Sequence, residues 1–158
     1  MHTVTSVLFV CAGNICRSPT AEVLCRRLVA SEPALANMTV GSAGTIAMDG
    51  NLPSADSVDA LRDGRNLELA THRARRLSRR DTADLILALD RETEQEAKAI
   101  CRGRRVEMLG DFAGTGEEVA DPYGWPRQRH DDALEHIERL VTFAVARLVS
   151  DAAAASGS

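Results

Sequence analysis

The sequence predicts a single-domain α/β fold in which a four-stranded parallel sheet is flanked by helices on both faces. Two observations support this prediction. Short apolar runs alternate with longer segments whose apolar residues recur at helical spacing, and this alternation is typical of parallel sheets. The 158 residues are enough for one core and too few for two. We therefore expect one domain over residues 1–150 and a small polar tail over residues 151–158 without regular structure.

The first half of the chain predicts two strand and helix pairs. The apolar run that ends at Val10 is typical of a buried strand. Ser18 and Pro19 are typical of a helix start, with the serine as cap and the proline at the first helical position. Gly64 is the expected stop of the second helix. The expected elements are a strand over residues 4–10, a helix over 18–30, a strand over 38–40, a loop over 45–53 and a helix over 54–63.

The second half continues the alternation. The unbroken apolar run from Leu85 to Leu89 predicts a strand that is covered on both faces. Gly103 should end the helix that follows, and apolar residues from Ala133 to Leu148 form one stripe of a final helix. The expected elements are a strand over residues 85–89, a helix over 91–102, a strand over 104–109, a long loop over 110–128 and a helix over 129–149.

Composition limits the classes of function. The formal charge of −4 argues against a nucleic-acid partner, and no apolar run approaches the ~20 residues of a membrane span. The chain does not start with a basic segment followed by an apolar one, so we expect a cytoplasmic protein. Cysteines there are usually free, and Cys25 and Cys101 should pack inside helices. The basic cluster at residues 72–80 is either a solvated surface or a positive rim that attracts phosphorylated or acidic partners.

The segment from Cys11 to Ser18 is the strongest indication of chemistry. It connects the first strand to the first helix, and five residues separate Cys11 from Arg17. Free backbone N–H groups and the positive end of a helix dipole can hold an oxyanion and stabilise a thiolate. A thiolate is the nucleophilic form of cysteine, and a planar guanidinium can bind two phosphoryl oxygens side by side. The loop therefore predicts a phosphate site with a nucleophile.

Asp121 is the best candidate for a general acid that protonates a leaving group. It precedes Pro122, which restricts it to an extended backbone, and it lies near Tyr123 and Trp125. The two aromatic side chains suggest a slot for a flat leaving group. An ordinary surface turn explains the same four residues, and this alternative stays open.

With these pieces together, the chain resembles the low-molecular-weight protein tyrosine phosphatases. The cysteine, five residues, arginine and serine pattern occurs in several unrelated phosphatases, whereas the later Asp-Pro-Tyr segment makes the match specific. The similarity extends from residue 4 to about residue 149. The matching pieces are Cys11 to Ser18, Ser42 to Thr45, His72 to Arg75, Leu87 to Arg91 and Asp121 to Tyr123.

The resemblance implies a flavodoxin-like fold and a reaction. Cys11 would be the nucleophile that forms a phosphocysteine, Arg17 would hold the phosphate, and Asp121 would act as general acid and later activate water. It implies no metal and no cofactor. The substrate would be a phosphotyrosine protein or a small aryl phosphate, and the protein would be a monomer or a weak dimer.

The resemblance also assigns roles to the loop. Asn14 would adopt a left-handed conformation, which asparagine tolerates, with support from Ser42 and His72. Ser18 can either cap the helix or donate a hydrogen bond to the Cys11 sulfur. Cys16 would form a reversible disulfide with Cys11 that protects it from over-oxidation. The implied phosphate-binding residues are Ala12, Gly13, Asn14, Ile15, Cys16 and Ser18.

One departure concerns the substrate pocket. Family members often carry an aromatic residue after the Ser-Ala-Gly-Thr segment, and residues 46–50 contain none. The expected pocket residues are therefore Met48, whose thioether can contact a ring, together with Tyr123 and Trp125.

Other functions remain as alternatives. An arsenate reductase of the same fold would need further thiols, and no cysteine lies between residues 26 and 100. An arginine phosphatase usually carries threonine where this chain has Ile15. A catalytically silent phosphate-binding module would need neither the thiol nor Asp121. A zinc site at Cys11 and Cys16 lacks a second ligand pair, and no Gly-Lys-Ser/Thr ends the loop as in a nucleotide-binding P-loop.

Overall fold

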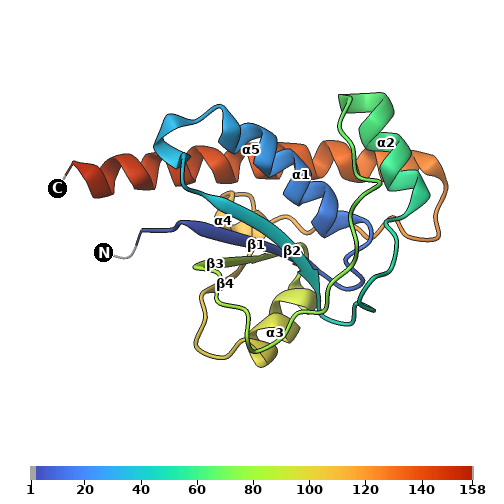
Figure 1. Ribbon diagram of the computed structural model, residues 1–158, viewed down its shortest axis with the longest axis horizontal. Helices are drawn as coiled ribbons and strands as arrows, with labels where there is room; N and C mark the ends of the chain where they lie inside the picture. The colour runs from blue at the N-terminus through green and yellow to red at the C-terminus, as the bar shows by residue number, and fades with distance from the viewer. Residues whose placement is uncertain (1–2, 158) are drawn as a thin grey trace.

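The computed structural model describes residues 3–157 and contains a four-stranded sheet with the strand order β2-β1-β3-β4 (Figure 1). All neighbouring strands pair in parallel, so their carboxyl ends meet at one edge of the sheet. The fold class predicted from the sequence is confirmed. The strands are β1 (Ser6–Cys11), β2 (Thr39–Gly44), β3 (Leu85–Ala88) and β4 (Val106–Met108).

Helices cover both faces of this sheet. In Figure 1, α1 and α5 lie on one face, and α3 lies on the other. Within residues 3–157, no helix is long and apolar enough to cross a membrane. The helices are α1 (Arg17–Ala30), the short 3-10 helix η1 (Pro33–Leu35), α2 (Ala55–Arg65), α3 (Arg91–Ile100), α4 (Leu109–Phe112) and α5 (Arg127–Ser156).

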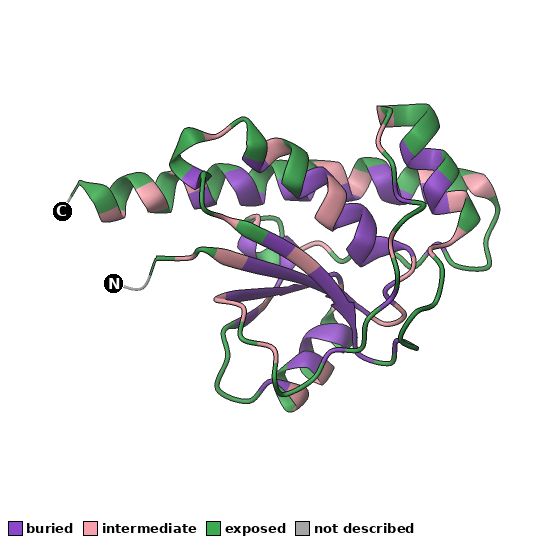
Figure 2. Cartoon of the chain, in the orientation of Figure 1, coloured by how far each residue is buried: buried purple, intermediate pink, exposed green. Residues whose placement is uncertain are grey.

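The alternation of side chains along β1 divides the core in two. Val7 and Phe9 belong to the larger core with α1 and α5, whereas Leu8 and Val10 belong to a smaller core that includes Ala97 of α3. All four side chains are buried, and Figure 2 shows the central strands almost wholly in the buried colour. This explains why the first strand is a continuous apolar run rather than an alternating one.

The position of β1 determines where a ligand can bind. From β1 the chain passes through α1 to β2 on one side, while β3 pairs on the other side. Such a reversal of strand order opens a crevice beyond the carboxyl end of the central strand. The strand β1 ends at Cys11, so the thiol stands at this crevice.

Several element boundaries differ from expectation. The helix α5 continues to Ser156, through most of the tail that we expected to lack structure, because alanine is the best helix former and Ala152 packs against the core. The helix α2 passes Gly64 and ends at Arg65, and the capping residue Asn66 takes the left-handed conformation with φ 55°. The strand β2 runs to Gly44 because it pairs with β1 along its whole length. The short α4 lies within the segment expected to be a loop.

Candidate active site

The loop between β1 and α1 brings Cys11 and Ser18 into contact. The Ser18 Oγ lies 2.9 Å from the Cys11 Sγ, and both residues are buried. The side-chain amide of Asn14 donates to the Ser18 Oγ at 2.8 Å, so the Ser18 hydroxyl can donate its own proton to the sulfur at 2.9 Å or to the more distant Ala43 carbonyl at 3.4 Å. The prediction that Ser18 caps the helix is wrong, because α1 begins at Arg17 and has no side-chain cap. The alternative, a hydrogen bond to the thiol, is the one the structure contains.

Asn14 shapes this loop from within. It is fully buried and has a left-handed backbone with φ 56°. Its side-chain amide also donates to the Ser42 Oγ at 3.0 Å, and its side-chain oxygen accepts from the Arg75 backbone N–H at 2.9 Å. The His72 Nε2 lies 2.8 Å from the Asn14 carbonyl oxygen and donates to it. The loop conformation is therefore held by contacts from two distant segments.

The close approach of the phosphate loop to the end of β2 requires glycine at position 44. A Cβ atom built at this position would lie 2.5 Å from the carbonyl oxygen of Ala12 and 2.9 Å from the backbone nitrogen of Asn14. Two hydrogen bonds connect the residues after β2 to this loop: the Thr45 N–H donates to the Cys11 carbonyl, and the Ile46 N–H donates to the Ala12 carbonyl. The loop thus lies directly on the end of β2.

Arg17 is buried and fixed by contacts on one side of its guanidinium. Its Nη1 donates to the Asp90 Oδ2 at 2.6 Å and to the Val119 carbonyl at 2.9 Å. Burial opposes the charge, but the Cys11 sulfur and Asp90 raise the pKa of Arg17 above its ordinary value. Burial likewise opposes the charge of Asp90, and hydrogen bonds from Thr93 and Arg17 hold the pKa of Asp90 below its ordinary value.

Sequence reasoning did not identify Asp90 as a site residue. Its Oδ1 also accepts from the Thr93 backbone N–H at 2.8 Å and caps α3. The sequence did contain an indication of this role, because Asp90 follows a buried strand whose carboxyl end lies at the same edge of the sheet as Cys11. An acid at that edge is a natural partner for a buried arginine.

Asp121 faces the phosphate loop across a pocket of about 300 Å³. Its Oδ2 lies 3.8 Å from the Arg17 Nη2, and its Oδ1 accepts from the Tyr123 backbone N–H at 3.1 Å. This turn holds the carboxyl in place while leaving it half exposed. The pocket is lined by Cys11, Ala12, Gly13, Asn14, Ile15, Cys16, Arg17, Ile46, Ala47, Met48, Asn51, Asp121 and Tyr123.

The walls of this pocket are only partly those expected. Met48 and Tyr123 line it, as predicted, and both are exposed. Trp125 is absent from this lining and lines an adjacent pocket that shares Asp121 with it. Ile46 and Asn51 were not foreseen. The rim beside the phosphate loop is therefore mainly aliphatic, with one tyrosine.

The four thiols lie in different environments. Burial raises the pKa of Cys16, and hydrogen bonds with Ser57 and Ser54 offset part of this rise. Burial raises the pKa of Cys25 to about 12. Cys101 packs in the smaller core with α3, on the opposite face of the sheet from Cys25. The structure therefore assembles no third thiol beside Cys11 and Cys16, as a thiol relay would require.

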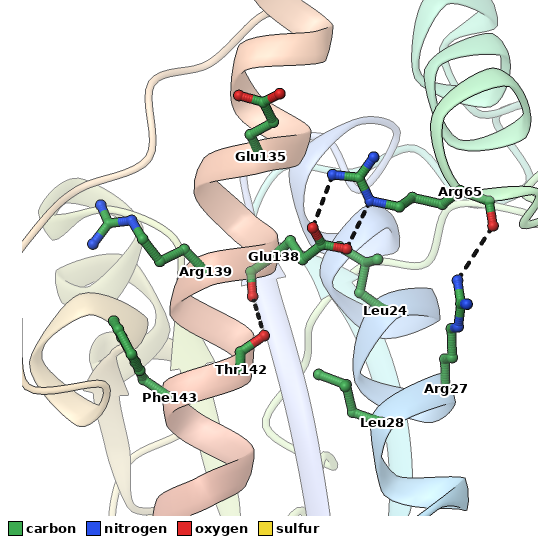
Figure 3. A pocket seen from close by; sticks show the side chains of 9 residues that line it. All are labelled: Leu24, Arg27, Leu28, Arg65, Glu135, Glu138, Arg139, Thr142 and Phe143. Carbon is green, nitrogen blue, oxygen red and sulfur yellow. Dashed lines mark hydrogen bonds and ion pairs between the residues drawn. The ribbon is translucent and has the colours of Figure 1, made fainter.

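A larger hollow of about 470 Å³ lies between α1 and α5, away from this loop (Figure 3). Two of its charged side chains, Arg65 and Glu138, pair with each other. Arg65 donates to both carboxylate oxygens of Glu138 at 2.7 and 2.8 Å, and Arg27 donates to the Arg65 carbonyl at 3.2 Å. The Arg65–Glu138 pair joins α2 to α5 across this hollow.

Comparison with known proteins identifies the family. The model of the family described as low molecular weight phosphotyrosine protein phosphatase matches residues 6–154. The chain is 33% identical to a probable low molecular weight protein-tyrosine-phosphatase, EpsP, of Ralstonia nicotianae, over 92% of this chain and 97% of that protein. Its structure is similar to that of the low molecular weight protein tyrosine phosphatase from T. tengcongensis, with a TM-score of 0.82 and 29% identity over 90% of this chain and 98% of that one.

An arginine phosphatase has the same fold. The YwlE arginine phosphatase from Geobacillus stearothermophilus is 29% identical, with a TM-score of 0.79 over 92% of this chain and 94% of that one. The relatives therefore include phosphatases named for two different substrates, and the family model covers nearly the whole of this chain. The chain belongs to the low molecular weight phosphotyrosine protein phosphatase family.

Proposed function

We propose that this protein hydrolyses aryl phosphate monoesters, with phosphotyrosine in proteins as its substrate class, through a phosphocysteine on Cys11. The observation that carries the proposal is the convergence of three groups on one pocket. The Cys11 sulfur lies within hydrogen-bond distance of Ser18, Arg17 is anchored by Asp90, and Asp121 faces the same space. A module that only binds phosphate needs neither a thiol nor an acid there.

The first step transfers the phosphoryl group to sulfur. The Cys11 thiolate attacks phosphorus while the bond to the aryl oxygen breaks, and Asp121 gives its proton to that oxygen. Within residues 3–157, the Nε and Nη2 of Arg17 make no hydrogen bond, since Asp90 and Val119 engage only Nη1. These two groups form the edge that can donate to two phosphoryl oxygens at once.

The second step releases phosphate. Asp121, now a carboxylate, accepts a proton from water as the water attacks phosphorus, and the bond from phosphorus to the Cys11 sulfur breaks. The Ser18 hydroxyl, 2.9 Å from that sulfur, can donate a hydrogen bond to the departing thiolate. The same residue thus favours the thiolate as nucleophile and as leaving group.

Ile15 supports an ester substrate over a phosphorylated arginine. It lines the phosphate pocket beside Cys11. The bulk of isoleucine, where the similar arginine phosphatases usually carry threonine, favours a flat aryl ester over a phosphoguanidine. We expect phosphotyrosine peptides to be turned over faster than phosphoarginine and phosphoserine peptides, and a faster reaction with phosphoarginine would reverse this assignment.

The setting of the reaction is part of the proposal. We infer from the sequence that the protein acts in the cytoplasm on phosphorylated proteins, without nucleic acid or membrane as partner, and as a monomer or weak dimer. Sedimentation of the purified protein at several concentrations tests the last point.

Turnover of p-nitrophenyl phosphate in the presence of a chelator tests the mechanism. The wild type should be active without added metal, and Cys11→Ser should be inactive. Activity retained by Cys11→Ser would exclude Cys11 as the nucleophile. Asp121→Asn should slow the release of a poor leaving group more than that of a good one, because only the poor one needs the proton. Equal losses would remove Asp121 from the role of acid.

A further inference from the structure

A second pocket of about 320 Å³ lies on the other side of the segment that carries Asp121. Asp121 lines both this pocket and the phosphate pocket, so the two are adjacent. Four of its lining residues belong to the first turns of α5. The pocket is lined by Ala120, Asp121, Pro122, Trp125, Arg129, Asp132, Ala133 and His136.

Arg129 and Trp125 form the most exposed part of this second pocket. The Arg129 guanidinium lies over the Trp125 ring at 5.0 Å from its centroid, and Trp125 is 56% exposed. Within residues 3–157, no carboxylate pairs with Arg129. A guanidinium stacked on an indole keeps its N–H edge free to bind a planar anion, and the ring shields one of its faces from water.

The acceptors around this second pocket are already engaged. Asp132 accepts from the Gln128 side chain at 2.8 Å, and Asp121 accepts from the Tyr123 backbone. His136 lies 3.7 Å from Glu117, outside the pocket, and Glu117 is bound by Arg139 at 2.7 Å. Within residues 3–157, the Arg129 cation has no ion-pair partner and the buried His136 Nε2 has no hydrogen bond, so the ligand that would pair with Arg129 is an anion.

We propose that this second pocket binds the carboxylate of an acidic residue next to the phosphotyrosine, through Arg129 stacked on Trp125. The inference rests on the proposed function, because it extends the same bound substrate. With the aryl phosphate in the first pocket, a peptide side chain next to it can reach the second pocket, because Asp121 lines both. A planar carboxylate can accept two parallel hydrogen bonds from a guanidinium.

Matched peptides test this assignment. Phosphotyrosine peptides with Glu or Gln at the positions immediately before and after the tyrosine are compared on wild type and Arg129→Gln. The wild type should show a KM about 2–5-fold lower for one Glu peptide than for its Gln counterpart, the range expected for an exposed ion pair. Arg129→Gln should abolish this difference while leaving kcat, and the turnover of p-nitrophenyl phosphate, unchanged.

Arg147 provides the control. Its guanidinium also stacks on an aromatic ring, 4.1 Å from the centroid of Phe112, but lies at α4, remote from both pockets. Arg147→Gln should preserve the preference for the Glu peptide, and Trp125→Ala should weaken it. An active wild type that treats Glu and Gln peptides alike, or an Arg129→Gln variant that keeps the preference, would overturn the inference. A wild type without phosphatase activity would instead refute the proposed function.

Discussion

The anchoring of Arg17 by Asp90 leads to a prediction in which stability and activity respond differently. The Asp90 carboxylate makes two structural contacts. One oxygen accepts a hydrogen bond from the Arg17 guanidinium at 2.6 Å, and the other accepts one from the Thr93 backbone N–H and so caps α3. Asp90→Ala removes both. Asp90→Ser can still cap the helix but is too short to reach Arg17. Asp90→Asn keeps one acceptor oxygen, which can still cap α3, but its NH2 group cannot accept the hydrogen bond from Arg17.

The magnitudes follow from these contacts. Removing one partner of a buried ion pair costs about 3–5 kcal/mol of unfolding free energy. The low end applies here, since Asp90 is 22% exposed and Arg17 keeps its bond to the Val119 carbonyl. Loss of a helix cap adds about 1 kcal/mol. We expect losses of about 4 kcal/mol for Ala and about 3 for both Ser and Asn, which keep the cap but lose the bond to Arg17.

The kcat values of the Asp90 variants should not follow the order of their stabilities. A loosened guanidinium misplaces the phosphoryl oxygens, and such misplacement costs about 10²-fold in kcat. Asp90→Ser and Asp90→Ala should therefore lose kcat for p-nitrophenyl phosphate equally, although urea unfolding separates them by about 1 kcal/mol. A Ser variant with wild-type kcat would show that Asp90 does not position Arg17.

The lowered pKa of Asp90 determines how its contribution to the free energy of unfolding changes with pH. Because this pKa is lowered in the folded protein, the carboxylate stabilises the fold above the ordinary value of 3.8. The contribution is lost as the pH falls through the lower folded value. The stability difference between wild type and Asp90→Ala should therefore shrink on acidification, and a constant difference would contradict the lowered pKa.

Three further predictions concern the loop and its thiols. Asn14→Gly keeps the left-handed backbone and loses the side-chain hydrogen bonds, so Asn14→Ala should be about 1 kcal/mol less stable than Asn14→Gly in urea; equal stabilities would argue against backbone strain. Gly44→Ala should displace the loop and lower kcat, whereas Gly41→Ala, whose Cβ meets only a side chain at 3.4 Å, should not; wild-type kcat in the first variant would refute the close approach. Ser57→Ala should move the pH midpoint of Cys16 alkylation upward, measured by peptide mass spectrometry, since a hydrogen bond that lowers the pKa of Cys16 is lost. An unchanged midpoint would argue against that bond.

Local patterns were enough to predict the fold. Apolar runs and helical spacing are properties of neighbouring residues, and they placed all four strands and the long helices in the right order. The boundaries that differed depend on partners far along the chain. Gly44 is in a strand because Cys11 pairs with it, and Ala152 is helical partly because it packs against the core.

The site was predictable where a single segment carries the signal. The loop from Cys11 to Ser18 is continuous in sequence, so its residues could be found together. Asp90 joins Arg17 across 73 positions, and the sequence does not state which acid approaches which arginine. Trp125 shows the opposite limit of local sequence. It lies near Asp121 in sequence, but the turn at Gly124, with φ 81°, intervenes and the indole lines the second pocket.

The central claim is that the phosphoryl group passes through the Cys11 sulfur. Rapid quenching of Asp121→Asn during turnover of an aryl phosphate, followed by mass spectrometry of the peptides, tests it most directly. Loss of the residue that activates water should slow release of phosphate and let the intermediate accumulate. The account predicts phosphate on Cys11 in nearly every molecule. Phosphate on another residue, or full turnover with an unmodified Cys11 throughout, would contradict it.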